Sequence, residues 1–319
     1  MNPAVYFSGT CSAGQFGLTK DGACSSTANT DFRRLASLSK PTEGQYLSYV
    51  DMFDSGGTSS YNALLLLAQK SLSRGVSVNA NYTWSHCIAD INQGSWVGSV
   101  GGGLNQANNR SFDRGNCQTQ TGTGINQSLD RRHIVNIAAV LETPKFSERA
   151  LRLVASGWKL SSSYRYLSGA FLNVTTGVDY ALNGSQVERP NLLLTDPLAT
   201  NPQSVCGNTA PCQAWLNPAA FSSSVPAGTF GNLGRSSVPG PNTWEIDMAL
   251  SRVFRVREGQ NFEIRGEAFN LTNSFRSCIG CVGGLLGGTS VTVRSSPQFG
   301  QITVADAPRI MQLAAKFVF

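Results

Sequence analysis

Apolar and polar residues alternate strictly along one short segment of the chain, residues 75–88. Its even positions are apolar and end in two aromatic rings: Val76, Val78, Ala80, Tyr82 and Trp84. Its odd positions are small and polar: Ser77, Asn79, Asn81, Thr83 and Ser85. Successive side chains of a β-strand point to opposite faces, so the segment is predicted to be a strand that separates an apolar from a polar environment.

The same period-two pattern recurs elsewhere in the chain, less cleanly in residues 60–70 than in the others. The predicted strands are 60–70, 75–86, 131–142, 157–168, 244–253, 262–271 and 311–319. Their usual length of about nine to eleven residues is what a tilted strand needs to cross a bilayer. Tryptophan and tyrosine near the strand ends are typical of the aromatic girdles of a membrane barrel. These rings are Tyr82, Trp84, Trp158, Tyr164, Tyr166 and Trp244.

Short and long links between the predicted strands alternate along the chain. The short links are 72–74, 142–156 and 255–260, and the long ones are roughly 86–130, 169–243 and 272–308. Outer-membrane barrels combine short periplasmic turns with long external loops in this way. The expected fold is therefore all-β, an antiparallel transmembrane β-barrel, with residues 1–58 as an external loop segment and 59–319 as membrane strands and loops.

The expected barrel is incomplete. Single-chain bacterial barrels have even numbers of strands, whereas seven are predicted here, and an open sheet leaves costly unpaired edges in lipid. The first residues, MNPAVYFSGTCSAG, also lack the basic and apolar regions of a secretory signal. We expect the chain to be the C-terminal portion of a larger barrel.

Composition narrows the class of protein further. Charged residues make up 14% of the chain, against about 25% in an ordinary soluble domain. The net charge is +6, but the basic residues are scattered and form no stripe with interleaved aromatics. Nucleic-acid binding is therefore not expected.

Eight cysteines fall as four pairs of near neighbours in loop-like sequence. The pairs are Cys11 with Cys24, Cys87 with Cys117, Cys206 with Cys212, and Cys278 with Cys281. Such local pairs favour disulfides formed in an oxidising compartment. The spacing of Cys278 and Cys281 also suits zinc, but no second such motif follows and the chain has only two histidines. We expect no metal and no cofactor.

Two groups of residues could suggest an enzyme. One is His133 with Asp130 and Arg131, but no nucleophile motif accompanies this histidine or His86. The other is a set of charges on neighbouring predicted strands: Glu245, Asp247, Glu263, Arg265 and Glu267. Paired carboxylates occur in glycosidases, but a polar barrel lumen with cross-strand ion pairs around Arg265 explains the same pattern. We therefore expect no catalytic residue and no enzyme activity.

Five segments carry a resemblance to a known family. They are SSYNALLLLAQKSLSRGVSVNANYTWSHCIAD (59–90), DRRHIVNIAAV (130–140), WLNPAAFSSSVPAGTFGNLGRSSVPGPNTWEIDMALSRVF (215–254), FEIRGEAFNLTNSF (262–275) and FGQITVADAPRIMQLAAKFVF (299–319). In them the chain resembles the C-terminal barrel region of TonB-dependent outer-membrane receptors of the Oar-like group, which carry a carboxypeptidase-regulatory-like domain. The resemblance implies a 22-stranded barrel closed by a plug domain and energised through TonB. We expect no plug domain in this chain.

The last predicted strand resembles the C-terminal signal by which the barrel-assembly machinery recognises outer-membrane proteins. Its alternating residues are Met311, Leu313, Ala315, Phe317 and Phe319. The leading hypothesis is thus the barrel part of an uptake receptor for a large external substrate, by analogy an oligosaccharide or a peptide, with outer-membrane lipid as its surroundings. A non-transporting structural or adhesive surface protein is the first alternative, and a soluble secreted β-sandwich the second.

Overall fold

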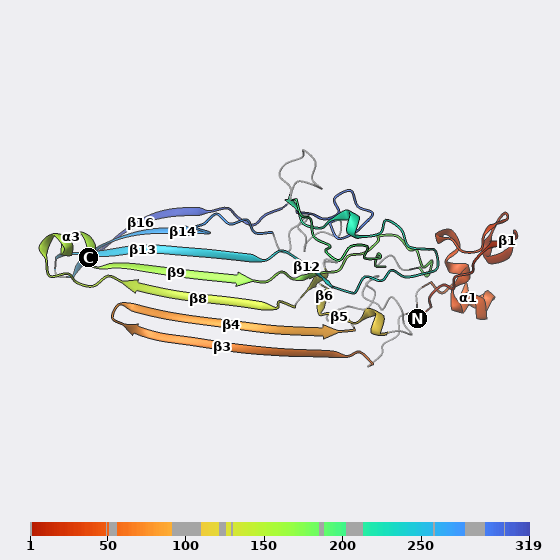
Figure 1. Ribbon diagram of the computed structural model, residues 1–319, viewed down its shortest axis with the longest axis horizontal. Helices are drawn as coiled ribbons and strands as arrows, with labels where there is room; N and C mark the ends of the chain where they lie inside the picture. Colours follow the sequence, from red (N-terminus) through yellow and green to blue (C-terminus); the bar gives the residue numbers. More distant parts are fainter. Residues whose placement is uncertain are drawn as a thin grey trace.

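Seven long strands form one antiparallel sheet in the order of the sequence (Figure 1). The computed structural model describes residues 2–48, 50, 56–90, 110–120, 126–128, 130–184, 188–201, 213–257, 259–277, 291–302 and 304–319. The strands are β3 (Ser59–Ser73), β4 (Val76–Ala89), β8 (His133–Glu142), β9 (Trp158–Leu167), β13 (Thr243–Arg257), β14 (Gln260–Phe269) and β16 (Ile310–Val318). All seven predicted strands are confirmed, although several bounds differ by up to four residues.

The sheet is open rather than closed into a barrel. Its strand order is β16-β14-β13-β9-β8-β4-β3, so within the described residues β3 and β16 are the edges, and the short β5 (Gly115–Asn116) pairs with the end of β4. The β3–β4 hairpin turns through Arg74 and Gly75, whose φ angles are both positive, 52° and 77°. This is the backbone of a two-residue turn that matches the twist of the strands.

The register places apolar and polar residues on separate faces of the sheet. One row across four strands joins Ala80, Ile137, Tyr164 and Ile246. The adjacent row, one residue along each strand, joins Asn81, Asn136, Arg165 and Glu245. We call these two surfaces the apolar face and the polar face. Because alternate residues point to opposite sides, the predicted assignment of Val76–Trp84 to one face is confirmed.

Aromatic rings mark both ends of the apolar face. Trp244 aligns with Tyr166 at the end near the long links, and Phe254 aligns with Phe262 at the end near the short turns. Trp244 and Phe254 are ten residues apart on β13, which is about 33 Å along a strand. With a tilt of about 40°, the band between them is about 25 Å tall, the height of the apolar band of a transmembrane barrel.

The long links fold into a second part at one end of the sheet, which we call the loop cap: the described residues of 110–132, 168–242 and 270–309 (Figure 1). Its regular elements are short: β6 (Gln118–Gln120), β7 (Asn126–Ser128), β10 (Phe171–Leu172), β11 (Gln213–Ala214), β12 (Val238–Pro239), β15 (Gln301–Ile302) and 3-10 turns at Arg110–Asp113 and Pro218–Ala220. The cap has its own buried core: Ala170, Leu172, Val174, Leu216, Ala220, Phe221, Leu233, Val238, Val291, Phe299 and Ile302.

Residues 2–48 form a small folded unit at the cap end of the molecule, where the sequence predicted only part of an external loop (Figure 1). This N-terminal unit contains β1 (Thr10–Cys11), β2 (Gly22–Ala23), α1 (Leu35–Ser39), α2 (Pro41–Gly44) and 3-10 turns at Gln15–Gly17, Thr27–Asn29 and Asp31–Arg33. The disulfide Cys11–Cys24 and the fully buried Arg33 hold it together. Ala4 N donates to Asn183 O of the loop cap at 3.1 Å.

A further helix, α3 (Arg149–Ala155), lies in the short link between β8 and β9, where no helix was predicted. Within the described ranges, none of the helices has both the length and the apolar character needed to span a bilayer.

The two faces make a matched test possible, because Ala138 lies on the polar face and its neighbour Ala139 on the apolar face of β8. Arginine at the lipid-facing midplane of a barrel costs about 2–4 kcal/mol, whereas a lumen-facing change costs far less. We expect Ala139→Arg to lower the free energy of unfolding by this amount and Ala138→Arg to have little effect, measured by urea unfolding in lipid vesicles. Equal losses would show that the two faces meet similar environments.

Candidate ligand-binding surface

The polar face is the candidate binding surface, because side-chain amides, hydroxyls and charges predominate on it along six of the seven long strands. Its main polar residues are Ser77, Asn79, Asn81, Thr83, Asn136, Ser161, Ser163, Arg165, Glu245, Asp247, Ser251, Glu263, Arg265, Glu267 and Gln312. β3 departs from this pattern, since Leu65 and Leu67 lie on the same face opposite Thr83 and Asn81. That departure matches the less regular alternation of residues 60–70.

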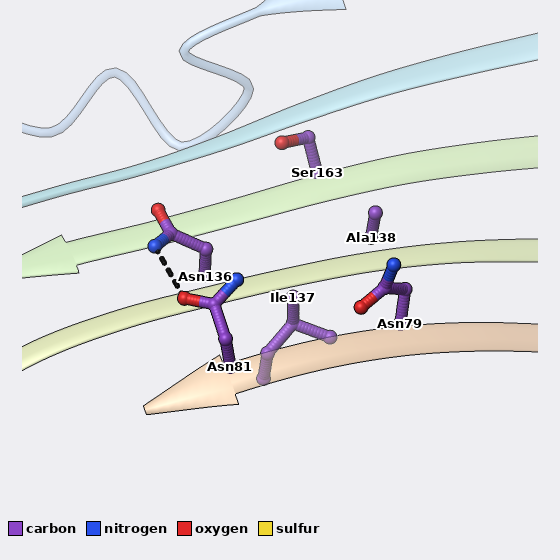
Figure 2. A pocket seen from close by; sticks show the side chains of 6 residues that line it. All are labelled: Asn79, Asn81, Asn136, Ile137, Ala138 and Ser163. Atoms are coloured by element: carbon purple, nitrogen blue, oxygen red, sulfur yellow. Dashed lines mark hydrogen bonds between the residues drawn. The ribbon is translucent and has the colours of Figure 1, made fainter. Parts of the chain in front are cut away.

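A shallow recess of about 160 Å³ lies on this face where β4, β8 and β9 adjoin. It is lined by Asn79, Asn81, Asn136, Ile137, Ala138 and Ser163 (Figure 2). Asn136 Nδ2 donates a hydrogen bond to Asn81 Oδ1 at 2.8 Å. Each side-chain amide carries two N–H donors and an oxygen acceptor, so this pair has capacity for further hydrogen bonds. The recess therefore suits a ligand that both donates and accepts, as hydroxyl and peptide groups do.

Several charged residues of the polar face are engaged with a neighbouring side chain or with the loop cap. Arg265 pairs with Glu267 at 2.5 Å along the same strand, so the predicted cross-strand ion pair at Arg265 is wrong in its partner. The cross-strand contact of Glu267 is instead with Gln312. Residues two apart on a strand share a face, which lets a long arginine reach its own-strand neighbour.

The two carboxylates of β13 also have structural partners. Arg276 of the loop cap binds Glu245 at 2.5 Å, and Asn270 N donates to Asp247 Oδ1 at 2.9 Å. These contacts fasten the segment that follows β14 to the end of β13. The carboxylates therefore act as attachment points in this structure.

The segment Asp130–His133 joins the start of β8 to the loop cap. Asp130 Oδ1 accepts from Cys87 N at 3.0 Å, and Arg131 donates to Ser168 O at 2.7 Å. His133 Nδ1 lies 2.8 Å from the hydroxyl of Tyr82 on the apolar face. The structure thus places His133 beside a tyrosine, while Asp130 binds a backbone group of β4 and Arg131 one of the residue that follows β9.

The disulfide Cys87–Cys117 fixes the end of β4 to the loop cap, as the cysteine spacing predicted. Cys117 N also donates to Cys87 O at 3.1 Å. Cys87 lies within β4, which continues to Ala89, so the strand extends further than expected. The predicted disulfides of Cys206 with Cys212 and Cys278 with Cys281 lie outside the described residues.

A buried ion pair that no sequence pattern indicates joins two separate links of the loop cap. Arg189 and Asp113 are 76 residues apart, yet their side chains are 2.9 Å apart and only 1% and 3% exposed. Arg189 also donates to Leu233 O at 2.8 Å and lies over the ring of Phe112, 4.3 Å from its centroid. Charge-assisted hydrogen bonds of this kind offset the cost of burying both charges.

Two carboxyl groups lie together inside the loop cap. Glu188 is 1% exposed and Asp179 is 6% exposed. Glu188 accepts from Tyr180 N and Ala181 N, whereas Asp179 accepts from Asn183 N and Gly184 N. Burial raises the pKa of Glu188 to about 8, with the negative charge of Asp179 adding to the shift and the backbone N–H groups opposing it.

Comparison with known families gives one finding. Residues 9–312 match the family model described as an outer membrane beta barrel domain. The match covers the loop cap, most of the N-terminal unit and the whole sheet except residues 313–318 of β16. No curated protein and no solved structure shows a significant match to the chain.

The ion pair of Arg189 and Asp113 can be tested by removing one partner. Asp113→Ala leaves a buried arginine without its carboxylate, a change that typically costs about 3–5 kcal/mol. We expect the loop cap to become sensitive to limited proteolysis while the sheet stays resistant. Glu142→Ala is the control, because Glu142 pairs with Lys159 at 3.9 Å with both side chains exposed, and such surface pairs contribute about 1 kcal/mol or less. Equal protease resistance of both variants would contradict a structural role for the buried pair.

The raised pKa of Glu188 predicts a pH dependence of the loop cap. The folded state holds the proton more tightly than the unfolded state, whose carboxyl has a pKa near 4.5. Protonation of Glu188 therefore stabilises the folded loop cap fully below pH 4.5, and this stabilisation is lost as the pH rises toward about 8. We expect the protection factors of the Tyr180 and Ala181 amides, that is, their exchange relative to the intrinsic rate at each pH, to fall across this range. Glu188→Gln should remove this pH dependence, whereas the exposed control Glu43→Gln should retain it. An unchanged pH dependence in Glu188→Gln would assign the effect to another group.

Proposed function

Because the chain belongs to the outer membrane β-barrel family, we propose that it is the barrel part of a TonB-dependent uptake receptor of the Oar-like kind. Its membrane is the outer membrane, so the apolar face meets lipid and the two aromatic rows lie at the bilayer interfaces. The substrate class that we propose is a large polar molecule, an oligosaccharide or a peptide, that enters from the side of the loop cap.

The observation that carries this proposal is the amide-lined recess on the polar face. Asn81, Asn136 and Ser163 come from three adjacent strands and meet at this recess (Figure 2). Amide and hydroxyl side chains recognise sugar hydroxyls and peptide groups through paired donors and acceptors. The exposed charges nearby give the same face further polar contacts.

TonB dependence and the Oar-like assignment are supported by the five resembling segments, which contain most of the residues of the seven long strands. Energy coupling in such a receptor acts through a plug domain, and the proposal requires one within the working receptor. We propose binding without chemistry, since Glu245, Asp247 and His133 have structural partners.

The proposal includes recognition of β16 by the barrel-assembly machinery. β16 alternates apolar residues that share the outward face, and Met311, Leu313 and Phe319 are 71%, 92% and 93% exposed. Gly266 on β14 leaves room for Leu313. A Cβ atom at position 266 would lie 3.3 Å from Leu313 Cδ2. An exposed apolar edge strand of this kind is available for pairing with another strand.

A structural or adhesive surface role is the second candidate, and the buried core of the loop cap favours it. Phe221 and Phe299 pack edge to face with centroids 5.4 Å apart, inside a core that no ligand site requires. A rigid surface structure is what an adhesive protein would present. The soluble β-sandwich is set aside, because the chain belongs to an outer-membrane family.

The role of the recess in binding can be tested with variants of two neighbouring serines on β9, because Ser163 lies on the polar face and Ser162 on the apolar face. We expect Asn81→Ala combined with Ser163→Ala to weaken binding of fluorescent oligosaccharides or peptides to cells about tenfold, from the loss of two hydrogen bonds. Ser162→Ala is the matched control and should bind normally. Loss of binding in the control alone would move the site off the polar face.

Uptake separates the two candidate functions. In cells that express the protein, we expect internalisation of the labelled substrate to stop when TonB is deleted, while surface binding remains. Binding to neighbouring cells or surfaces, with no internalisation in either strain, would support the adhesive role instead.

A further inference from the structure

The short helix α3 (Arg149–Ala155) exposes apolar side chains at the end of the sheet opposite the loop cap (Figure 1). Leu151, Leu153 and Val154 are 46%, 75% and 69% exposed. At 100° per residue, these three lie on one side of the helix and the two arginines, Arg149 and Arg152, on the other. The segment is therefore amphipathic although it is only seven residues long.

The contacts of α3 place its C-terminal end on the outward side of the barrel wall. Trp158 Nε1 donates to Val154 O at 2.8 Å, and Arg252 Nη1 donates to the same oxygen at 3.0 Å. Trp158 and Arg252 are paired neighbours in the register on the apolar face of the sheet. Since both side chains project outward and hold the helix by its last carbonyls, α3 lies on the side that meets lipid.

The same end of the sheet carries exposed basic residues on two of its links and on the end of β13: Arg74, Lys145, Arg149, Arg152, Arg255 and Arg257. Two exposed acids are described there, Glu142 and Glu148, and Glu142 already lies 3.9 Å from Lys159. Glu258 lies outside the described residues. The turn end is therefore basic around an apolar helix, which is the pattern of a segment that lies in a membrane interface and attracts anionic headgroups.

We propose that α3 is an interfacial anchor on the turn side of the outer membrane. Its leucines and valine insert among the acyl chains beside the barrel wall, while Arg149, Arg152 and the neighbouring basic residues bind anionic phospholipid headgroups. This role goes beyond substrate uptake, because it fixes the depth and orientation of the sheet whatever the substrate is.

The test uses the full chain folded into nanodiscs of phosphatidylcholine, with or without added phosphatidylglycerol. We expect amide exchange at 152–155 to be slower in the discs that contain phosphatidylglycerol. The double variant Arg149→Gln with Arg152→Gln should exchange these amides about thirtyfold faster in the discs that contain phosphatidylglycerol. That is the effect of losing two basic residues near an anionic surface. Lys20→Gln with Lys40→Gln, at exposed positions of the N-terminal unit, is the matched control and should retain the protection.

Leu153→Gln with Val154→Gln should remove the protection in both kinds of disc, and exchange in β9 reports whether each variant is folded. Equal exchange of α3 in both lipid compositions would overturn the headgroup contact. Protection that appears only after addition of a periplasmic extract would assign the surface to a protein partner and overturn the lipid anchor.

Discussion

The register of the antiparallel hydrogen-bond ladder is the constraint on which the rest of the structure depends. A slip of one residue between two strands would carry every polar side chain to the apolar face. In lipid this slip is prohibitive, because the bilayer offers no hydrogen bonds to displaced amides or charges. The irregularities lie near the turns, between Lys70 and Ser73 and between Arg255 and Arg257, outside the regular pairing of the strand centres.

The open edges of the sheet raise the same problem of unsatisfied polar groups in lipid. Backbone groups on the outer edges of β3 and β16 need partners in lipid, since each unsatisfied group costs several kcal/mol (about 2–7). β3 is exposed along its whole length, and Leu65 and Leu67 face the polar side. A strand whose two faces are both largely apolar is only weakly fixed in register by its pattern. Its pairing with the alternating β4 therefore supplies the register that its own sequence lacks.

The sequence predicts the sheet well and the loop cap poorly, for a physical reason. Period-two alternation is a local signal, so segments such as Trp244–Leu250 disclose a strand and its two faces without any knowledge of the fold. The cap core joins Leu172, Phe221 and Phe299 across more than a hundred residues, and no periodicity links them. The ion pair of Arg189 and Asp113 is equally non-local. Helix α3 was missed because seven residues make only two turns, too few for a helical period to stand out.

The distance between the recess and the loop cap bears on the size of the substrate. Asn136 at the recess lies four residues along β8 from Arg132, which binds Asn116 of the cap at 2.8 Å. Four residues of strand span about 13 Å. A single sugar or amino acid is too short to touch both places, whereas an oligosaccharide or peptide of a few units can. Asp130 and Arg131 bind backbone groups next to the ends of the adjacent strands, so the two places keep a fixed separation. A ligand of the proposed class that touched both would therefore have to be several units long.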